Sequence, residues 1–302
     1  MTEIYDYIIV GSGSAGSALA YRLGESGKHR ILVLEYGGSD AGPLIQMPAA
    51  LSYPMNMKRY DWEYLAEPEA SLDGRRLVCP RGKVLGGSSS INGMIYVRGN
   101  AGDYDHWQET GADGWSYADV LPYFRRMEHA HGGAAGWRGS AGPLHVTRGP
   151  RDNPLHDAFV TAATEAGYAA VDDYNGYRQE GFGAADMTVW QGRRWSAANA
   201  YLRPALRRGN VKLVSGALVE KILIDGKTAT GVAYWKAGKR YEATARAETV
   251  LAAGAINSPQ IMQRSGVGPG AVLQAAGADG ILERAGVGAH QPDPRAVYFQ
   301  NT

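Results

Sequence analysis

This sequence has almost no cysteine, no long apolar run and no excess of one charge. A single cysteine, Cys79, among 302 residues excludes an intramolecular disulfide and favours a reducing compartment. No run approaches the roughly 18 apolar residues of a membrane-spanning helix, and a first strand that begins by Ile4 leaves no room for a signal peptide. Basic and acidic residues number 31 and 30, so nothing favours a nucleic-acid partner. We expect a cytoplasmic protein, with peripheral contact at the inner membrane left open.

Signatures of several enzyme classes are absent as well. The sequence has no G-x-S-x-G, so the nucleophile elbow of a hydrolase is excluded. His129 and His131 are separated by one residue, but no further ligand lies near them at a metal-binding spacing, and we expect no metal site. His106, His145 and His156 are isolated and are expected to be structural or solvent-facing. The chemistry must therefore come from other features.

Glycine, by contrast, is abundant, with 41 residues, and the first cluster lies near the N-terminus. A β-rich apolar run at 5–10 leads into G-x-G-x-x-G at 11–16, an amphipathic run at 17–23 follows, and a second apolar run at 31–34 ends in Glu35. This order and spacing predict a βαβ unit that binds a dinucleotide. A bare Gly-rich turn is the alternative, but it would not need a strand, a helix and an acid at these distances.

Each glycine of this motif has its own predicted role. Gly11 permits a tight turn, Gly13 lets the backbone approach a pyrophosphate, and Gly16 lets the helix pack closely on the strand. The helix N-terminus offers N–H groups to the phosphates, and Glu35 accepts ribose hydroxyls, which disfavours NADP. The motif alone leaves FAD and NAD open. The predicted cofactor-binding residues here are Gly11, Ser12, Gly13, Ser14, Ala15, Gly16 and Glu35.

A second Gly-rich segment lies at 80–94. A flexible Gly/Ser linker is one interpretation, but Val84, Leu85, Ile91 and Met94 interrupt the glycines and serines, and an apolar run follows. Apolar residues at such intervals predict a loop that is anchored in a core. Its bare backbone and small hydroxyls would suit a polar, planar ligand.

The stretch from Gly82 to Asp105 resembles the first signature of the glucose–methanol–choline (GMC) oxidoreductases. It contains G-K-x-L-G-G-S-S-x-I-N-x-x-x-Y, followed by Gly99 and Asp105. By that resemblance the cofactor is FAD, and this segment lies along the isoalloxazine and its phosphates. The residues implied in cofactor binding are Val84, Gly87, Asn92, Gly93, Met94 and Ile95.

A resemblance to the second signature of the family lies at 254–259 and 265–269, with a polar stretch between them where the family is usually apolar. The resemblance also implies that the backbone near Val219 contacts the adenine, and that roughly 150–190 belongs to the substrate side. Several blocks in that region are most similar to the choline-oxidising members of the family.

The predicted fold class is α/β: a Rossmann-type FAD-binding domain of the GMC kind with a β meander and a partial substrate lobe. A meander and a last buried strand are predicted from patterns at 211–214, 217–224, 231–235, 240–245 and 248–253. We expect the FAD-binding domain in two parts with a substrate-side segment between them, at 1–149, 150–194 and 195–302.

The resemblance implies FAD-dependent oxidation of a primary alcohol, first of all choline to betaine aldehyde, with hydride transfer to the flavin and a quinone or another electron acceptor. The family's catalytic base is a His in the C-terminal half; we expect it beyond Thr302 and assign no catalytic residue. At 289–295 the family pattern is interrupted, which a short out-of-frame stretch would explain. The alternatives are an aliphatic or polyether alcohol as substrate, a catalytically silent FAD-binding fragment, and an NAD-linked dehydrogenase.

Overall fold

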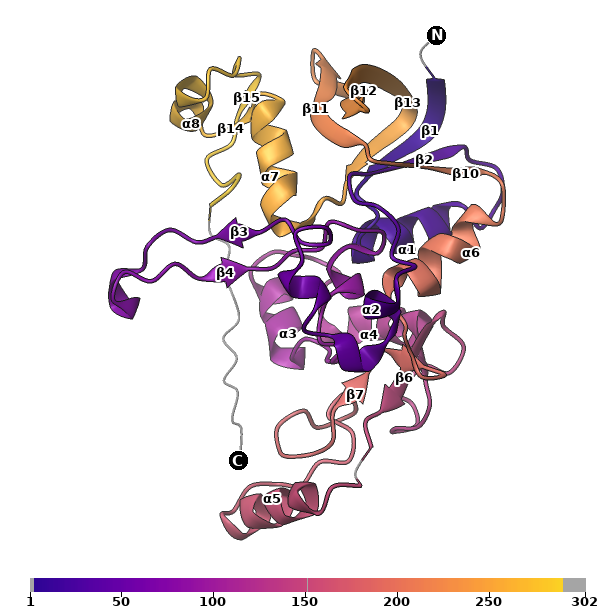
Figure 1. Ribbon diagram of the computed structural model, residues 1–302, viewed down its shortest axis with the longest axis vertical. Helices are drawn as coiled ribbons and strands as arrows, with labels where there is room; N and C mark the ends of the chain where they lie inside the picture. Colours follow the sequence, from indigo (N-terminus) through magenta and orange to yellow (C-terminus); the bar gives the residue numbers. More distant parts are fainter. Residues whose placement is uncertain (1–2, 151, 290–302) are drawn as a thin grey trace. The chain divides into compact units, whose positions relative to one another are not determined.

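The computed structural model describes residues 3–150 and 152–289 (Figure 1). The chain divides into two compact units. The first unit combines the N-terminal segment up to Tyr36 with the segment from Arg208 onward, and the second unit is 37–207. Each unit has its own sheets. Within the described part of the chain, no helix is both long and apolar enough to cross a bilayer.

A six-stranded sheet forms the centre of the first unit, in the order β10-β2-β1-β13-β12-β11. β1 runs parallel to β2 and β13, β2 runs parallel to β10, and β12 and β11 are antiparallel. Helix α1 packs on β1 and β2, and α7 packs on β11. The elements of this unit are β1 (Glu3–Val10), α1 (Ser14–Leu23), β2 (Ile31–Glu35), β10 (Val211–Ser215), β11 (Leu218–Asp225), β12 (Thr228–Lys236), β13 (Lys239–Leu251), α7 (Gly254–Arg264), β14 (Val267–Gly268), α8 (Gly270–Ala275) and β15 (Leu282–Glu283).

The parallel centre of this sheet follows from its apolar strands. All five residues of β2 are buried, and the last three residues of β1, which are Ile8, Ile9 and Val10, are at most 3% exposed. Continuous burial is typical of a strand that is covered on both faces, and burying each such side chain contributes about 1.5–3 kcal/mol. The predicted α/β class with a central sheet is confirmed.

One strand differs from the prediction. The patterns at 240–245 and 248–253 predicted two strands, but the structure has the single strand β13, which pairs with β12 and with β1. Its register against β1 shifts by one residue after Tyr5. The extra residue forms a bulge, and a bulge interrupts the alternation of buried and exposed side chains on which the sequence pattern depends.

The second unit has little regular structure. Its sheets are β5-β6-β7, β3-β4 and β8-β9. Its longer helices begin at polar caps, since Asn100, Ser116 and Asn153 accept backbone N–H groups at the starts of α3, α4 and α5. The elements are α2 (Pro43–Gln46), β3 (Tyr64–Leu65), β4 (Val78–Cys79), α3 (Ala101–Glu109), α4 (Tyr117–Met127), β5 (Glu128–Ala130), β6 (Leu144–Arg148), α5 (Pro154–Glu165), β7 (Asp186–Met187), β8 (Val189–Trp190), β9 (Arg193–Arg194) and α6 (Arg203–Leu206), with short turns of 3-10 helix at Pro48–Ala50, Pro54–Asn56, Ala70–Leu72 and Gly87–Ser90 and a π turn at Ala198–Leu202.

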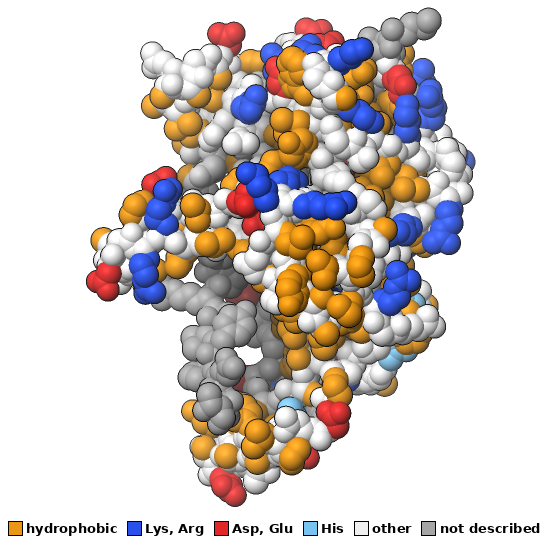
Figure 2. All heavy atoms as spheres, viewed as in Figure 1, with side chains coloured by type: hydrophobic (Ala, Val, Ile, Leu, Met, Phe, Trp, Pro, Cys, Tyr) orange, Lys and Arg blue, Asp and Glu red, His pale blue; other side chains and the backbone are white. Residues whose placement is uncertain are grey.

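Apolar side chains are exposed in the segment that directly follows α2 in the second unit. Figure 2 shows them gathered on the viewed face over the region of α2. Met47 and Tyr53, in this segment, are 50% and 61% exposed. Exposed apolar patches of this kind commonly mark surfaces that contact another protein segment or a ligand.

The boundaries of the two compact units differ from those of the functional segments expected from the sequence. The units divide after Tyr36 and before Arg208, whereas the expected segments were 1–149, 150–194 and 195–302. Those segments describe which part serves the cofactor and which serves the substrate. Their assignment stays a prediction.

Candidate functional site

The carboxyl ends of three parallel strands meet at Gly11. The N–H of Gly11 donates to the carbonyl of Leu34 in β2 (2.8 Å), and the N–H of Ala252, just after β13, donates to the carbonyl of Val10 (2.8 Å). In the sheet, β2 lies on one side of β1 and β13 on the other. Ligands of open α/β sheets bind outside the carboxyl ends of strands, where neighbouring connections lead in opposite directions. Gly11 occupies such a position.

Backbone packing at this turn requires two of the predicted glycines. Gly11 has a φ of +99°, and a Cβ atom there would lie 2.4 Å from the carbonyl oxygen of Ala252. At Gly16 a Cβ atom would lie 1.9 Å from the carbonyl oxygen of Gly11. Both distances are far too short for real atoms, so a side chain at either position would displace the backbone. The loop has the tight turn and the close helix packing of a dinucleotide-binding loop.

The first turn of α1 is suited to an anion. Its N-cap residue, Gly13, is extended and makes no side-chain capping hydrogen bond, and the first turn contains no acidic residue. Ser14 and Ala15 are exposed. The N–H groups of a first helical turn have no partner within the helix and carry a partial positive charge, so this end of α1 fits a pyrophosphate.

A buried carboxylate lies beside this turn. Glu35, the last residue of β2, is only 7% exposed. Its Oε2 accepts hydrogen bonds from the backbone N–H of Ser12 (2.9 Å) and from the Ser12 hydroxyl (2.8 Å). Ser12 is fully buried, so its side chain positions Glu35 rather than facing a ligand. The two residues fix the acid of β2 to the Gly-rich turn.

Val219 belongs to the same end of the sheet. The N–H of Ala217 donates to the carbonyl of Glu35 (2.9 Å), and β11 begins directly afterward. The Val219 side chain packs in the core cluster that contains Val10 and Leu34, the residues before Gly11 and Glu35. The structure therefore brings the eight predicted residues of the first unit to one edge: Gly11, Ser12, Gly13, Ser14, Ala15, Gly16, Glu35 and Val219.

The second Gly-rich segment, in the second unit, is tightly packed. A Cβ atom on Gly37 would lie 2.1 Å from the backbone nitrogen of Val84, and one on Gly82 would lie 2.2 Å from the carbonyl carbon of Gly87. Gly87 is buried and has a φ of +55°. Such close backbone contacts exclude the linker interpretation. The Val84 side chain is fully buried, in a cluster with Ile45, Tyr60 and Ile91.

Arg194 fastens this segment from inside the second unit. Its side chain is fully buried, and its guanidinium donates to the carbonyls of Ile45 (2.9 Å), Ser89 (3.3 Å) and Asn92 (2.7 Å). Burial lowers the pKa of Arg194 to about 10, which still leaves the side chain charged near neutrality. No sequence motif marks Arg194 as a support of this segment, because its partners are backbone carbonyls.

Predicted residues of this segment point in different directions. Met94 has a φ of +64° and a fully buried side chain, so any contact of Met94 with a cofactor would come from its backbone. Asn92 is exposed, and its Oδ1 accepts from the Met94 N–H (3.1 Å) and from Arg194 (3.0 Å). Ile95 is 55% exposed. The side chains of Val84 and Met94 are thus buried, whereas Asn92 and Ile95 are exposed.

The predicted residues therefore form two groups, one in each compact unit. The second group consists of Val84, Gly87, Asn92, Gly93, Met94 and Ile95. A family model described as GMC oxidoreductase matches residues 5–291, nearly the whole chain, and so includes both groups. The chain belongs to the GMC oxidoreductase family.

This membership confirms the resemblance carried by the two signatures. GMC oxidoreductases are FAD-binding flavoproteins, so FAD is confirmed over NAD as the cofactor of the family. Which residues of this GMC chain contact FAD stays a prediction.

Two similar proteins are named oxygen-dependent choline dehydrogenases. That of Brucella anthropi is 59% identical over 296 residues, and that of Rhizobium rhizogenes is 57% identical over 297 residues. Each match covers 98% of the GMC chain and 54% of the relative. The chain thus spans about half the length of the curated relatives it matches.

Solved structures share the fold of this GMC chain. Pyridoxine 4-oxidase from Mesorbium loti superposes with a TM-score of 0.88 at 33% identity, covering 94% of this chain and 55% of that one. A mutant of formate oxidase from Aspergillus oryzae, described for the effect of its mutation on FAD modification, has a TM-score of 0.86 at 26% identity, covering 93% of this chain and 51% of that one. The predicted fold of the GMC kind is confirmed.

Three histidines of the GMC chain lie together, contrary to the expectation that His145 is isolated. His129 and His145 are direct partners in the parallel pair β5–β6, and His131 lies two residues after His129. Burial lowers the pKa of His131 and of His145, and neighbouring imidazoles lower both further. The sequence shows a His-x-His spacing at 129–131, which is typical of one face of a strand. It does not show that β6 pairs with β5 and brings His145 beside these two histidines.

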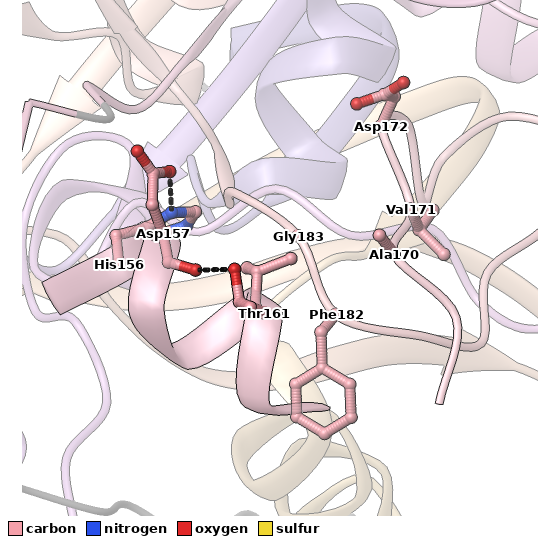
Figure 3. A pocket seen from close by; sticks show the side chains of 9 residues that line it. His156, Asp157, Thr161, Ala170, Val171, Asp172, Phe182 and Gly183 are labelled. Carbon is pink, nitrogen blue, oxygen red and sulfur yellow. Dashed lines mark hydrogen bonds and ion pairs between the residues drawn. The ribbon is translucent and has the colours of Figure 1, made fainter. Parts of the chain in front are cut away.

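A cavity of about 250 Å³ in the second unit contains none of the predicted cofactor residues (Figure 3). Figure 3 shows His156, Asp157 and Thr161 on α5, with Asp172 on a separate loop. Asp157 lies 3.6 Å from His156, and its carbonyl accepts from the Thr161 hydroxyl (2.8 Å). These are ordinary local contacts of a helix, and we assign the cavity no part in the chemistry of the GMC chain.

Proposed function

We propose that this chain supplies the FAD-binding part of a GMC alcohol dehydrogenase. The observation that carries the proposal is the buried Glu35, fastened to Ser12 beside the uncapped first turn of α1. A carboxylate and the N–H groups of a helix N-terminus at adjacent positions match the ribose and the pyrophosphate of an ADP moiety.

The residues of the chain have distinct parts in this proposal. In the first unit, the N–H groups of the first turn of α1 hold the pyrophosphate, Glu35 accepts the ribose hydroxyls, and the backbone at Val219 contacts the adenine. In the second unit, the backbone of the segment with Val84, Gly87 and 92–95 lies along the flavin. When bound, FAD supplies the acceptor for the hydride of an alcohol, while the protein orients the reactants.

The substrate that the family relationship supports best is choline, oxidised to betaine aldehyde. Both similar choline dehydrogenases are more than half identical to this chain across nearly all of it. The electron acceptor is proposed to be a quinone or another acceptor, such as the oxygen that the names of those relatives indicate. Catalytic groups and contact with a membrane are not assigned to residues of this chain.

A charge placed at the first turn of α1 tests the cofactor site. Ser14→Asp adds a carboxylate where the pyrophosphate is proposed to bind, while an acid in a first turn stabilises a helix by about 0.3–1 kcal/mol. We expect the Kd for FAD to rise at least about tenfold, or about 1.4 kcal/mol, with an unchanged or higher Tm. Titration of FAD fluorescence measures the effect.

Ser14→Asn is the matched control, because it has the same size without the charge. We expect it to bind FAD like the unmodified chain. Equal FAD affinity in the aspartate and asparagine variants would mean that the pyrophosphate lies elsewhere, and the proposed site would be wrong.

The substrate is tested in a chimera that continues this chain into the C-terminal part of the Brucella anthropi relative. Reduction of an acceptor dye is followed with choline and with hexanol. We expect choline to be preferred at least about tenfold, a difference of about 1.4 kcal/mol in the barrier. Preference for hexanol would support an aliphatic alcohol instead, and a yellow protein that oxidises neither would support a silent FAD-binding chain.

A further inference from the structure

Strand geometry places three imidazoles on one face of the β5–β6 pair. β5 and β6 are parallel, with His129 directly opposite His145. His131 lies two residues beyond His129, and its N–H still donates to the carbonyl of Val146 (2.9 Å), which extends the ladder past the end of β5. Residues two apart on a strand share a face, so the three side chains emerge side by side.

The ring nitrogens are close enough to share one ligand. Nε2 of His131 lies 2.9 Å from Nδ1 of His145, and one ligand atom from each of the three rings lies within 4.8 Å of the others. Tetrahedral zinc with nitrogen ligands has bonds of about 2.0–2.1 Å, which places pairs of nitrogens about 3.3 Å apart. His129 stacks on His131 and His145, at interplanar angles of 17° and 30°. Binding of one ion would require the His129 ring to turn out of this stack, so that a ring nitrogen of each histidine faces the same point.

Two tryptophans hold the rings of His131 and His145 in place. Trp190 stacks on His131 and on His145, with ring centroids 4.0 Å and 4.5 Å apart and interplanar angles of 10° and 7°. Trp195 meets His145 edge-on, and its Nε1 is itself bonded to the carbonyl of Pro143 (2.8 Å). Ligands held in this way lose little side-chain freedom when a metal binds.

The start of β5 is fixed on its opposite face. The carboxylate of Glu128 is fully buried and accepts from Arg98 (2.7 Å), Arg138 (3.0 Å) and the N–H of Gly139 (2.8 Å). Because side chains alternate along a strand, this anchor holds the backbone while the neighbouring His129 faces the other way. The strand that carries two of the three imidazoles is therefore rigidly placed.

We propose that His129, His131 and His145 bind one divalent transition-metal ion, with Zn²⁺ as the reference ion and water as the fourth ligand. Three imidazoles without a carboxylate or thiolate suit Zn²⁺, Cu²⁺ and Ni²⁺ and not the oxygen-seeking Mg²⁺. The ion replaces the hydrogen bond between His131 and His145 and cross-links β5 to β6. The competing interpretation is a stacked cluster of rings that only packs against Trp190.

Calorimetric titration of the whole chain, free of any affinity His tag, separates these interpretations. We expect one Zn²⁺ per chain, tighter binding of Cu²⁺ in line with the usual order of divalent metals, and no binding of Mg²⁺ at the same concentration. Hydrogen exchange should slow in β5 and β6 when Zn²⁺ is added. Absence of Zn²⁺ binding by the folded chain would overturn the proposal.

Two variants locate the ion. His145→Phe keeps a ring to stack on Trp190 but has no ligand atom, and His129→Asn removes the ring that stacks on the other two imidazoles. Each variant should weaken Zn²⁺ binding at least about tenfold. Even the loss of a residue that only hydrogen-bonds to a metal ligand lowers metal affinity about 10–100-fold. His106→Gln, an exposed histidine on α3, is the control and should bind Zn²⁺ normally. Undiminished binding by both cluster variants would place the ion elsewhere and overturn the proposal.

Discussion

The two compact units of this chain are stabilised in different ways. In the first unit, apolar strands pair side by side in one sheet, and Ile8, Ile9, Ile31 and Val33 are fully buried. In the second unit, the apolar core is accompanied by a buried ionic network. Glu128 is fully buried there between Arg98 and Arg138, and Arg138 also pairs with two further buried carboxylates, those of Asp173 (2.8 Å) and Asp186 (2.7 Å).

This difference determines how each unit responds to substitution. Apolar burial is spread over many contacts, so the removal of one side chain leaves a cavity whose cost depends on how far its neighbours relax. A buried ion network is concentrated, because the removal of one partner leaves uncompensated charges in a medium that solvates them poorly. Single charged side chains should therefore matter more in the second unit than single apolar side chains do in the first.

The largest loss of folding stability is expected from Arg138→Met. This change leaves Glu128, Asp173 and Asp186 without their shared buried cation, and breaking a buried pair costs about 3–5 kcal/mol. Urea unfolding measures the loss. Arg148→Met is the matched control, because Arg148 contacts two of the same carboxylates but is 30% exposed, and its loss should be much smaller. Equal losses would show that the network is not the main support of this unit.

The next effect is expected in the first unit from Leu32→Ala. Leu32 lies in β2 and is 1% exposed, and such truncations cost about 2–5 kcal/mol. Hydrogen exchange should accelerate in β1, β2 and β10 while amides of the second unit keep their protection. A uniform loss of protection over both units would mean that they unfold together and are not stabilised separately.

A smaller, local effect is expected from Arg194→Lys. Lysine keeps the charge but loses the fork that reaches three backbone carbonyls, and a hydrogen bond to a charged group is worth about 1.5–3 kcal/mol. Limited proteolysis should then cut within 82–95 more rapidly. Arg193→Lys is the control, because the neighbouring Arg193 is exposed, and it should leave the rate of proteolysis unchanged. If both variants are cut alike, Arg194 does not hold this segment.

The smallest effect is expected at the exposed pair Glu3–Lys212. The hydrogen bond from Lys212 lowers the pKa of Glu3 below its ordinary value of 4.5, so its stabilisation is complete above that value and is lost as the pH falls through the lowered pKa. The pair is more than half exposed, and we expect less than about 1 kcal/mol. Acid unfolding of Glu3→Gln should lack this contribution, and a larger difference would contradict the account.

The same contrast explains what the sequence could predict. The βαβ unit of the first unit was predicted closely, because buried parallel strands read as apolar runs and because Gly11 and Gly16 have backbone requirements that only glycine meets. The bulge in β13 was missed because it interrupts strand periodicity.

In the second unit, sequence distance concealed the important contacts. Arg194 lies about a hundred residues from the carbonyls of Ser89 and Asn92 that it holds, and its partners are backbone atoms that have no sequence signal. His145 was separated from His129 by a loop that gave no sign of the parallel pairing of β5 and β6. The signatures located the loop, but only tertiary structure supplied its support.

Whether this GMC chain binds FAD is tested most directly by the visible absorption spectrum of the purified chain after gel filtration. We expect flavin bands that migrate with the protein, about one FAD released per chain on denaturation, and no displacement by NADH. A folded, colourless chain that takes up no added FAD, or that binds NADH in its place, would contradict this expectation.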